Sequence, residues 1–353
     1  MIKSRWARVL IVEDSPVAGR ILSEGISRDQ RLAVAGIAVT ARSAVEMAER
    51  LRPDVITLDL VLPDESGLRV VQRVLHTRHV PIIIVSTLGV DGSESMPFLA
   101  LAAGAADVIV KPAGNETALR SFFPDLNERI ATLAAEHAVP THTPVEHVRA
   151  RGVDMPMRGA AIECVVIGAS TGGPPALVEL LTGLGPDFPA PIIIVQHIAA
   201  PFIEGLVRWL DKETPLTVSL AENGTKPVRG RAYLAPSGAD LVFESDGRLR
   251  VLPVASDRRA IAPSADALFS SAAEIYGARC AGVLLTGMGR DGADGLLKLR
   301  TKGAKTFAQD ERSCTVFGMP AAAGRLGAVE AFGEPRTIAG RLRKLAARLE
   351  RMS

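Results

Sequence analysis

A serine, a histidine and an acid each follow a separate apolar run in the second half of the sequence. Ser170 follows one run through a glycine turn, His197 closely follows a second, and Asp291 lies in a glycine-rich loop after a third. Parallel strands end at a common edge of their sheet, so these side chains are expected there together. A hydroxyl, a neutral imidazole and a carboxylate can act as nucleophile, general base and orienting group. The pattern predicts acyl-transfer chemistry.

The serine motif on its own permits two functions. Ser170 lies in the pattern GxSxG, which begins at Gly168 and is followed by prolines 174 and 175. Such a serine sits at a strand-to-helix turn, near free backbone N–H groups that attract negative charge. The same glycine turn could hold the phosphate of a nucleotide. However, the acid that dinucleotide-binding folds carry roughly 20 residues further on is missing, because the apolar run 192–195 stands there.

The second half offers one candidate for the general base and two for the orienting acid. His197 is the only one of the six histidines that lies outside both the first half and a proline-broken stretch in the middle. Two acids, Asp291 and Asp294, could orient its imidazole, and either could instead cap the following helix. The residues alone leave that choice open. The order Ser, His, Asp also differs from the Ser, Asp, His order of α/β-hydrolases, so the motif does not imply that fold.

Acidic and basic side chains also follow apolar runs in the first half. Glu13 and Asp14 follow the first run, Asp59 the third, Thr87 the fourth and Lys111 the fifth. Three carboxylates at one sheet edge repel one another unless a divalent cation is bound, and oxygen ligands favour Mg²⁺. A lysine and a hydroxyl beside them suit a phosphoryl group on one carboxylate.

The elements that must position these residues alternate in both halves. Short apolar runs are separated by helix-length amphipathic segments, a pattern typical of parallel sheets covered by helices. The runs are 9–12, 32–38, 55–58, 82–85 and 108–110, then 164–167, 192–195, 231–234 and 282–285. Asp246-Gly247 within 241–254 indicates a hairpin with a type I′ turn. A basic amphipathic helix at 336–351 is expected to close the chain.

The middle of the chain separates the two halves. The stretch 137–160 carries three prolines and scattered charge without apolar periodicity, as exposed linkers do. We therefore predict an α/β fold with two doubly wound parallel-sheet domains. Their expected bounds are 7–136 and 161–350, with 137–160 as the interdomain linker.

The composition of the chain argues against nucleic-acid binding and against insertion in a membrane. The chain has 353 residues, of which 47% are hydrophobic and only 4% aromatic, with a formal net charge of +2. Low aromatic content and near-neutral charge argue against nucleic-acid binding. Three scattered cysteines, without a CxxC pair, favour a reducing compartment. With no signal-peptide pattern and no run of about 18 apolar residues, we expect a cytoplasmic protein that is not inserted in a membrane.

The first half resembles a response-regulator receiver domain. The segments VEDS, TLDLVLPDESGL, VST and VIVKP carry this resemblance, which spans residues 8 to about 135. It implies a CheY-like fold, in which Asp59 accepts phosphate from a histidine kinase. It also implies that Glu13, Asp14 and Asp59 bind Mg²⁺, and that Thr87 and Lys111 contact the phosphoryl group.

The second half resembles the catalytic domain of CheB, the family of chemotaxis protein-glutamate methylesterases. The motifs GASTGGP, IIIVQHI and LLTGMGRDGADGL carry the resemblance, YLAPSGADL and FAQDERSCTVFGMP extend it, and together they span about 162–349. The resemblance implies a Rossmann-like domain in which Ser170 is the nucleophile, His197 the base and Asp291 the orienting acid. Thr171 and Met288 would line the site, Met288 through its backbone N–H in the oxyanion hole.

The order of the two domains is that of the same family. The resemblance implies hydrolysis of glutamyl methyl esters on the cytoplasmic domains of chemoreceptors, deamidation of receptor glutamines, and no cofactor for the ester chemistry. An unphosphorylated receiver would cover the active site until a chemotaxis histidine kinase phosphorylates Asp59. Val108 stands where the family's switch aromatic is usual, so no ring can report phosphorylation there. A non-catalytic scaffold is the remaining alternative, and the intact triad argues against it.

Overall fold

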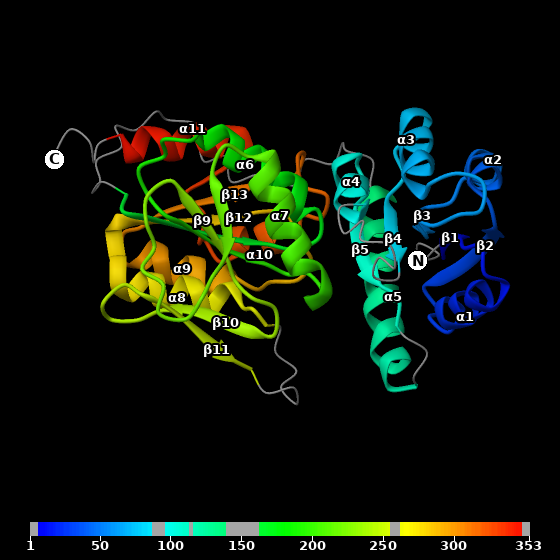
Figure 1. The fold of residues 1–353 in the computed structure, drawn as a ribbon, viewed down its shortest axis with the longest axis horizontal. Coiled ribbons are helices and arrows are strands. Elements are labelled where there is room, and N and C mark those ends of the chain that lie inside the picture. Colours follow the sequence, from blue (N-terminus) through cyan, green and yellow to red (C-terminus); the bar gives the residue numbers. More distant parts are fainter. Residues whose placement is uncertain (1–5, 87–95, 113–115, 139–161, 255–261, 348–353) are drawn as a thin grey trace. The chain divides into compact units, whose positions relative to one another are not determined.

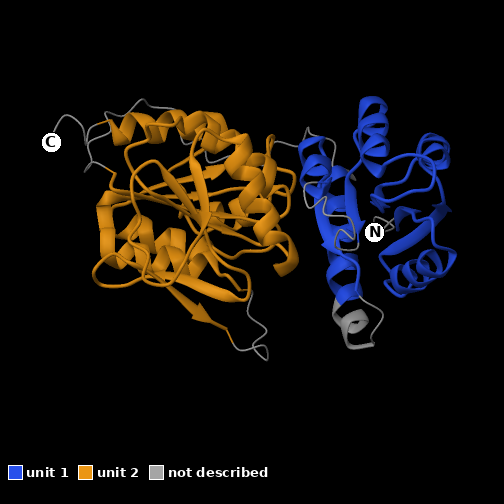
Figure 2. Cartoon of the chain, viewed as in Figure 1, with its two compact units in different colours: residues 1–143 blue, residues 144–353 orange. Residues whose placement is uncertain are grey.

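The chain forms two units, residues 1–143 and 144–353, each built around its own parallel sheet (Figure 2). This computed structural model describes residues 6–86, 96–112, 116–138, 162–254 and 262–347. The α/β architecture with two parallel sheets confirms the predicted fold class.

The sheet of the first unit has five parallel strands in the order β2-β1-β3-β4-β5 (Figure 1). The strands are β1 (Ala7–Val12), β2 (Leu32–Ala38), β3 (Val55–Leu58), β4 (Ile82–Ser86) and β5 (Asp107–Val110). The helices are α1 (Pro16–Ser27), α2 (Ala41–Leu51), α3 (Gly67–Thr77), α4 (Met96–Ala102) and α5 (Glu116–Ala138). Since β2 and β3 lie on opposite sides of β1, the strand order reverses between β1 and β3, where ligands bind in such sheets.

Local signals set the helix ends in this unit. The Ser15 hydroxyl accepts a hydrogen bond from the Ala18 N–H, and Pro16 occupies the first turn of α1. At α2, Thr40 and Ser43 cap the helix reciprocally. The helix ends at Arg52, which has a left-handed φ of 49° and precedes a proline.

The residues of β3 and those of β1 after Arg8 are buried, which explains their continuous apolar sequence.

The second unit contains a seven-stranded parallel sheet in the order β14-β13-β12-β6-β7-β9-β8. Its strands are β6 (Cys164–Ala169), β7 (Ile192–Gln196), β8 (Thr217–Leu220), β9 (Arg231–Leu234), β12 (Cys280–Leu284), β13 (Lys305–Gln309) and β14 (Ala331–Gly333). Strands β7 and β12 lie on opposite sides of β6. The strand order therefore reverses between β6 and β12. Strands β8, β13 and β14 were not predicted; β8 and β14 are short edge strands, which their neighbours define more than their own pattern does.

Helices cover both faces of this sheet. Helix α6 packs against α7 and α11, whereas α8 packs against α9, and α9 against α10 (Figure 1). The helical elements are α6 (Gly173–Leu184), η1 (Ala200–Phe202), α7 (Ile203–Glu213), α8 (Ala265–Tyr276), η2 (Gly277–Arg279), α9 (Ala293–Thr301), α10 (Met319–Arg325) and α11 (Pro335–Ala346). The predicted closing helix corresponds to α11, which buries Ile338 and Leu342. Within the described ranges, every helix is too short or too polar to cross a lipid bilayer.

The predicted hairpin is present, but its turn is of a different type. Strands β10 (Ala239–Phe243) and β11 (Leu249–Pro253) pair antiparallel. A type I′ turn needs a positive φ at both Asp246 and Gly247, and only Gly247 has one, at 80°. The Gly247 N–H donates to the Glu244 carbonyl at 2.9 Å. The Glu244 N–H also donates to the Arg248 carbonyl at 2.9 Å, so the loop is the three residues 245–247 and its last residue is the left-handed glycine. Asp246 therefore needs no positive φ.

The boundary between the units falls near the predicted linker. Helix α5 continues to Ala138, so the first two residues of 137–160 are helical. The remainder of that linker lies outside the described residues. The domain bounds 7–136 and 161–350 therefore stay predictions.

Candidate functional site

Ser170 occupies a tight turn between β6 and α6. The Gly173 N–H donates to the Ser170 carbonyl at 2.7 Å, and Gly172 has φ 75° and ψ 0°, as a type II turn requires at its third residue. An added Cβ at Gly172 would also lie 2.3 Å from the Thr315 hydroxyl. The Ser170 N–H donates to the Thr286 carbonyl at 3.0 Å, which fixes the turn to the neighbouring strand end. Ser170 is only 7% exposed.

His197 lies beside Ser170 because β6 and β7 are neighbours in register. Ala169 is paired with Gln196, and the His197 N–H donates to the Ala169 carbonyl at 2.9 Å. Ser170 and His197 are therefore the residues that follow one register pair. The predicted meeting of these two residues at the sheet edge is present in the fold.

The acid beside the imidazole is Asp291 and not Asp294. His197 Nε2 lies 2.9 Å from Asp291 Oδ2, and both side chains are largely buried. Asp294 instead pairs with Arg290 at 2.8 Å, and 59% of its side chain is exposed. A second glycine turn places Asp291: the Ala293 N–H donates to the Arg290 carbonyl, and Gly292 has a φ of 85°.

The N-terminus of α8 holds the Asp291 carboxylate. Oδ1 accepts from the Ser264 hydroxyl at 2.9 Å and from the Asp266 N–H at 3.1 Å, and Oδ2 accepts from the Ala265 N–H at 2.6 Å. Burial alone would raise the pKa of Asp291, but the hydrogen bonds from His197 and from these backbone groups lower it from 3.8 to about 2. Asp291 is therefore ionised at neutral pH and can stabilise a protonated imidazole.

A reciprocal contact fixes helix α9 relative to α8. Asp266, in the first turn of α8, accepts a hydrogen bond from the Gly295 N–H in the first turn of α9 at 2.6 Å. Burial raises the pKa of Asp266 to about 6, and the charges of Asp291 and Asp294 add to this effect. Asp291, just before α9, accepts from N–H groups at the start of α8, and Asp266 of α8 accepts from an N–H group at the start of α9. These reciprocal contacts hold Asp291 in place.

The contact with Asp291 determines which nitrogen of His197 is basic. An ionised carboxylate can only accept, so Nε2 carries the proton and Nδ1 of the neutral ring is the free base. Both Ser170 and His197 are described, and no side-chain hydrogen bond joins them in this structure. Such contacts often shorten only when substrate binds.

Thr171 lies within the serine turn, and Met288 follows Gly287, where an added Cβ would lie 2.6 Å from Ser170 Cβ. Thr171 is buried, and its carbonyl accepts a hydrogen bond from the Thr286 hydroxyl at 3.0 Å. Met288 is half-buried in the loop after β12, and its backbone N–H makes no hydrogen bond within the described part of the chain. That N–H is available to an acceptor such as an oxyanion.

Three residues that hold the site in place are not singled out by the sequence patterns. Ser264 holds Asp291, Thr286 hydrogen-bonds to the Thr171 and Val316 carbonyls, and Gln196 contacts the backbone of the serine turn. A signal existed for Gln196, because it is a polar residue at the end of a buried apolar strand.

In the first unit, three acids converge between β1 and β3. Ligand oxygens of Glu13, Asp14 and Asp59 lie within 4.8 Å of one another. Lys111 Nζ lies 2.5 Å from Glu13 Oε2 and also contacts Asp59. Burial raises the pKa of Glu13, and the charge of Asp59 adds to this, although Lys111 lowers it. Three carboxylates against one ammonium form an oxygen-only set that fits Mg²⁺.

Two other predicted positions bear on this site. Thr87 lies outside the described residues. Val108 is buried in β5, with 4% exposure, three residues before Lys111. At this position, the described structure has a buried aliphatic side chain.

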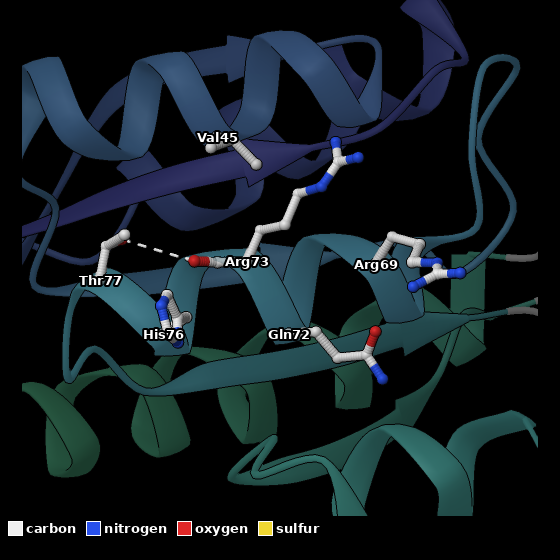
Figure 3. A pocket seen from close by; sticks show the side chains of 6 residues that line it. All are labelled: Val45, Arg69, Gln72, Arg73, His76 and Thr77. Carbon is white, nitrogen blue, oxygen red and sulfur yellow. Dashed lines mark hydrogen bonds between the residues drawn. The ribbon is translucent and has the colours of Figure 1, made fainter.

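A hollow between α2 and α3 is separate from both sites (Figure 3). Its lining residues are Val45, Arg69, Gln72, Arg73, His76 and Thr77. The Thr77 hydroxyl lies 3.5 Å from the Arg73 carbonyl (Figure 3). None of these residues belongs to the candidate sites.

Comparison with known proteins assigns both units. Residues 9–122 match the response regulator receiver domain, and residues 165–342 match the CheB methylesterase domain. A protein-glutamate methylesterase/protein-glutamine glutaminase of Anaeromyxobacter dehalogenans is 42% identical over 92% of this chain and 93% of its own length. One from Paramagnetospirillum magneticum is 39% identical over 96% and 97%. The CheB methylesterase catalytic domain of Thermotoga maritima, a crystal structure, has a TM-score of 0.50 and 35% identity, covering 53% of this chain and 100% of that domain.

Proposed function

The chain belongs to the CheB family of protein-glutamate methylesterases, and we propose that it hydrolyses glutamyl methyl esters on chemoreceptors under the control of its receiver domain. One observation carries the proposal. The carboxylate of Asp291, ionised and held by α8, contacts the imidazole of His197, which follows the same register pair as Ser170. This is the order of groups that a serine esterase needs.

In the proposed reaction, the Ser170 hydroxyl attacks the ester carbonyl while His197 Nδ1 takes its proton. The oxyanion is held by backbone N–H groups near the serine turn, with Met288 N–H among them; the loss of one such donor typically costs about 10²–10³ in kcat. The imidazolium returns the proton to the leaving oxygen, and methanol departs. Water, deprotonated by His197, then hydrolyses the acyl-serine and regenerates Ser170 and a glutamate. Asp291 stabilises the imidazolium in both halves.

We propose the same route for receptor glutamines. The serine attacks the side-chain amide, the imidazolium protonates the nitrogen, and ammonia leaves in place of methanol. The acyl-serine is identical in both cases, so the second half of the reaction and its product, glutamate, are shared. The printed names of the relatives combine these two activities.

The first unit is proposed to control this chemistry through a phosphoryl group on Asp59. Glu13, Asp14 and Asp59 would hold Mg²⁺, which supplies neutralisation of phosphoryl charge when it is bound. Lys111, already at Asp59, and Thr87 would contact the phosphoryl oxygens. A chemotaxis histidine kinase is the proposed phosphodonor. The unphosphorylated receiver would cover the esterase site, and phosphorylation would uncover it. The protein is proposed to act in the cytoplasm.

Methanol release from methylated chemoreceptor membranes tests the esterase assignment. The wild-type protein is expected to release methanol, and the Ser170→Ala variant, which lacks the attacking oxygen, is expected to release none above background. Release by Ser170→Ala at the wild-type rate would assign the chemistry to another residue. An inactive wild type, tested with and without acetyl phosphate and Mg²⁺, would favour a non-catalytic scaffold.

A further inference from the structure

We propose that Gln196 is a positioning residue that sets the distance between the nucleophile and the base; this rests on the proposed function. Gln196 is the last residue of β7 and is 2% exposed. Its Nε2 donates to the Ser170 carbonyl at 2.8 Å and to the His197 carbonyl at 3.0 Å. A single buried amide group therefore joins the backbones of both residues.

The carboxamide can adopt only one orientation. Two carbonyl oxygens face one side of it, and only its NH₂ group can donate to both. Its Oε1 is directed towards the start of α6, where it is buried without a hydrogen-bond partner in the described structure. Pro174 and Pro175 have no N–H to offer it, so the positive end of the helix is its remaining source of stabilisation.

Gly173 makes room for this amide. A Cβ added at Gly173 would lie 2.0 Å from Gln196 Oε1, well inside any real contact distance. Helix α6 therefore begins with a residue that lets the Gln196 side chain reach the serine turn. Because the Gly173 N–H also donates to the Ser170 carbonyl, glycine and glutamine hold the same oxygen.

The Gln196 amide lies where the pairing of β6 and β7 ends. The strand ladder between β6 and β7 ends at Ala169 and Gln196, and the reacting side chains lie one residue beyond it. No side-chain hydrogen bond joins Ser170 to His197 in the described structure, so their separation depends on the backbone. The Gln196 amide extends the connection between the two strands to those two residues.

Gln196→Met tests this role, because methionine has a similar length and no hydrogen-bonding amide. We expect kcat for methanol release to fall about 10²-fold, the size of effect that a small misplacement of reacting groups produces, with little change in KM. Thr306→Val is the matched control: it removes a hydroxyl that accepts from the Glu330 N–H at 3.2 Å, is buried in the same sheet, and touches neither reacting residue. Gln196→Met loses two side-chain hydrogen bonds and Thr306→Val loses one, and only Gln196→Met should lose activity.

The pH profile separates positioning from stability. In Gln196→Glu, a carboxylate would face two carbonyl oxygens at high pH, whereas the protonated acid can donate to one of them. Its activity relative to wild type should rise as the pH falls. If Gln196 has a purely structural role, the pH profiles of Gln196→Glu and the wild type should be parallel.

Gly173→Ala provides a second variant if Gln196→Met does not fold. Its Cβ displaces the same amide, so a comparable loss of kcat is expected. In the double variant the losses should not add, since both act through one group.

Labelling of Ser170 by a fluorophosphonate, followed by intact mass, measures the nucleophile without any receptor. Slower labelling of folded Gln196→Met and Gly173→Ala than of Thr306→Val supports the proposal. Labelling and kcat equal to wild type in folded Gln196→Met would overturn it. An active wild type with that result refutes the positioning role alone, whereas no methanol release despite rapid labelling refutes the methylesterase proposal.

Discussion

The two candidate sites occupy the same place in two different sheets, but their carboxylates are stabilised by different means. In the first unit, Glu13, Asp14 and Asp59 follow β1 and β3, between which the strand order reverses. In the second, Ser170 and Asp291 follow β6 and β12, again at the reversal. A sheet edge alone therefore gives a place for a ligand and not a particular chemistry.

What surrounds the carboxylates makes the difference. Asp291 accepts four hydrogen bonds, three from the start of α8 and one from His197, and its pKa is lowered to about 2. Burial raises the pKa of Glu13, the charge of Asp59 adds to this, and the one lysine of the site, Lys111, contacts Glu13 and Asp59. A carboxylate whose charge is balanced by hydrogen bonds from the protein can serve a histidine, whereas three carboxylates beside a single ammonium group favour an added cation.

The largest expected effect comes from neutralising the satisfied carboxylate. Asp291→Asn should lower kcat for methanol release by about 10⁴-fold, because an amide can hold the imidazole in the wrong tautomer. Asp294→Asn is the matched control three residues away, and it should leave kcat unchanged because its ion pair is exposed. A reversed result, with Asp294→Asn inactive, would remove the basis of the comparison.

At the other edge, removing one acid should weaken cation binding. We expect Glu13→Gln to reduce Mg²⁺ affinity by about 10–100-fold, measured by calorimetric titration of the whole chain. Asp125→Asn removes an exposed carboxylate that pairs with Arg129 in the same unit, and it should bind Mg²⁺ as the wild type does. Equal affinity in all three proteins would show that these acids do not form the cation site.

The smallest expected effect concerns stability in acid. Because the folded pKa of Asp291 is below 3.8, its ionised form stabilises the fold above about pH 4, and this contribution is lost as the pH falls towards 2. It amounts to roughly 2 kcal/mol at neutral pH. In urea unfolding of the second unit, the gap between wild type and Asp291→Asn should shrink from pH 7 to pH 3. A gap independent of pH would mean that Asp291 is not held as an ionised group.

The positions of the site residues could largely be predicted from the sequence. Apolar runs followed by Glu13, Asp59, Ser170 or His197 mark strand ends, and parallel strands bring those ends to one edge. Which strands are neighbours could not be predicted, because the order β12-β6-β7 depends on long-range packing.

The choice between Asp291 and Asp294 was also beyond the sequence. Both acids lie at the start of α9, and their local patterns are alike. The difference arises at Ser264–Asp266, more than twenty residues earlier, where α8 offers donors to Asp291 only. The hairpin shows a similar limit: its two strands were predicted, but the φ of Asp246 was not.

We propose that phosphorylation at the acidic edge of the first unit controls ester hydrolysis at the serine edge of the second. Methanol release from methylated receptor membranes tests this coupling, with wild type and Asp59→Asn each assayed with and without acetyl phosphate and Mg²⁺. We predict that the phosphodonor raises release by the wild type and has no effect on Asp59→Asn. Active proteins whose rates are the same in all four conditions would contradict the claim.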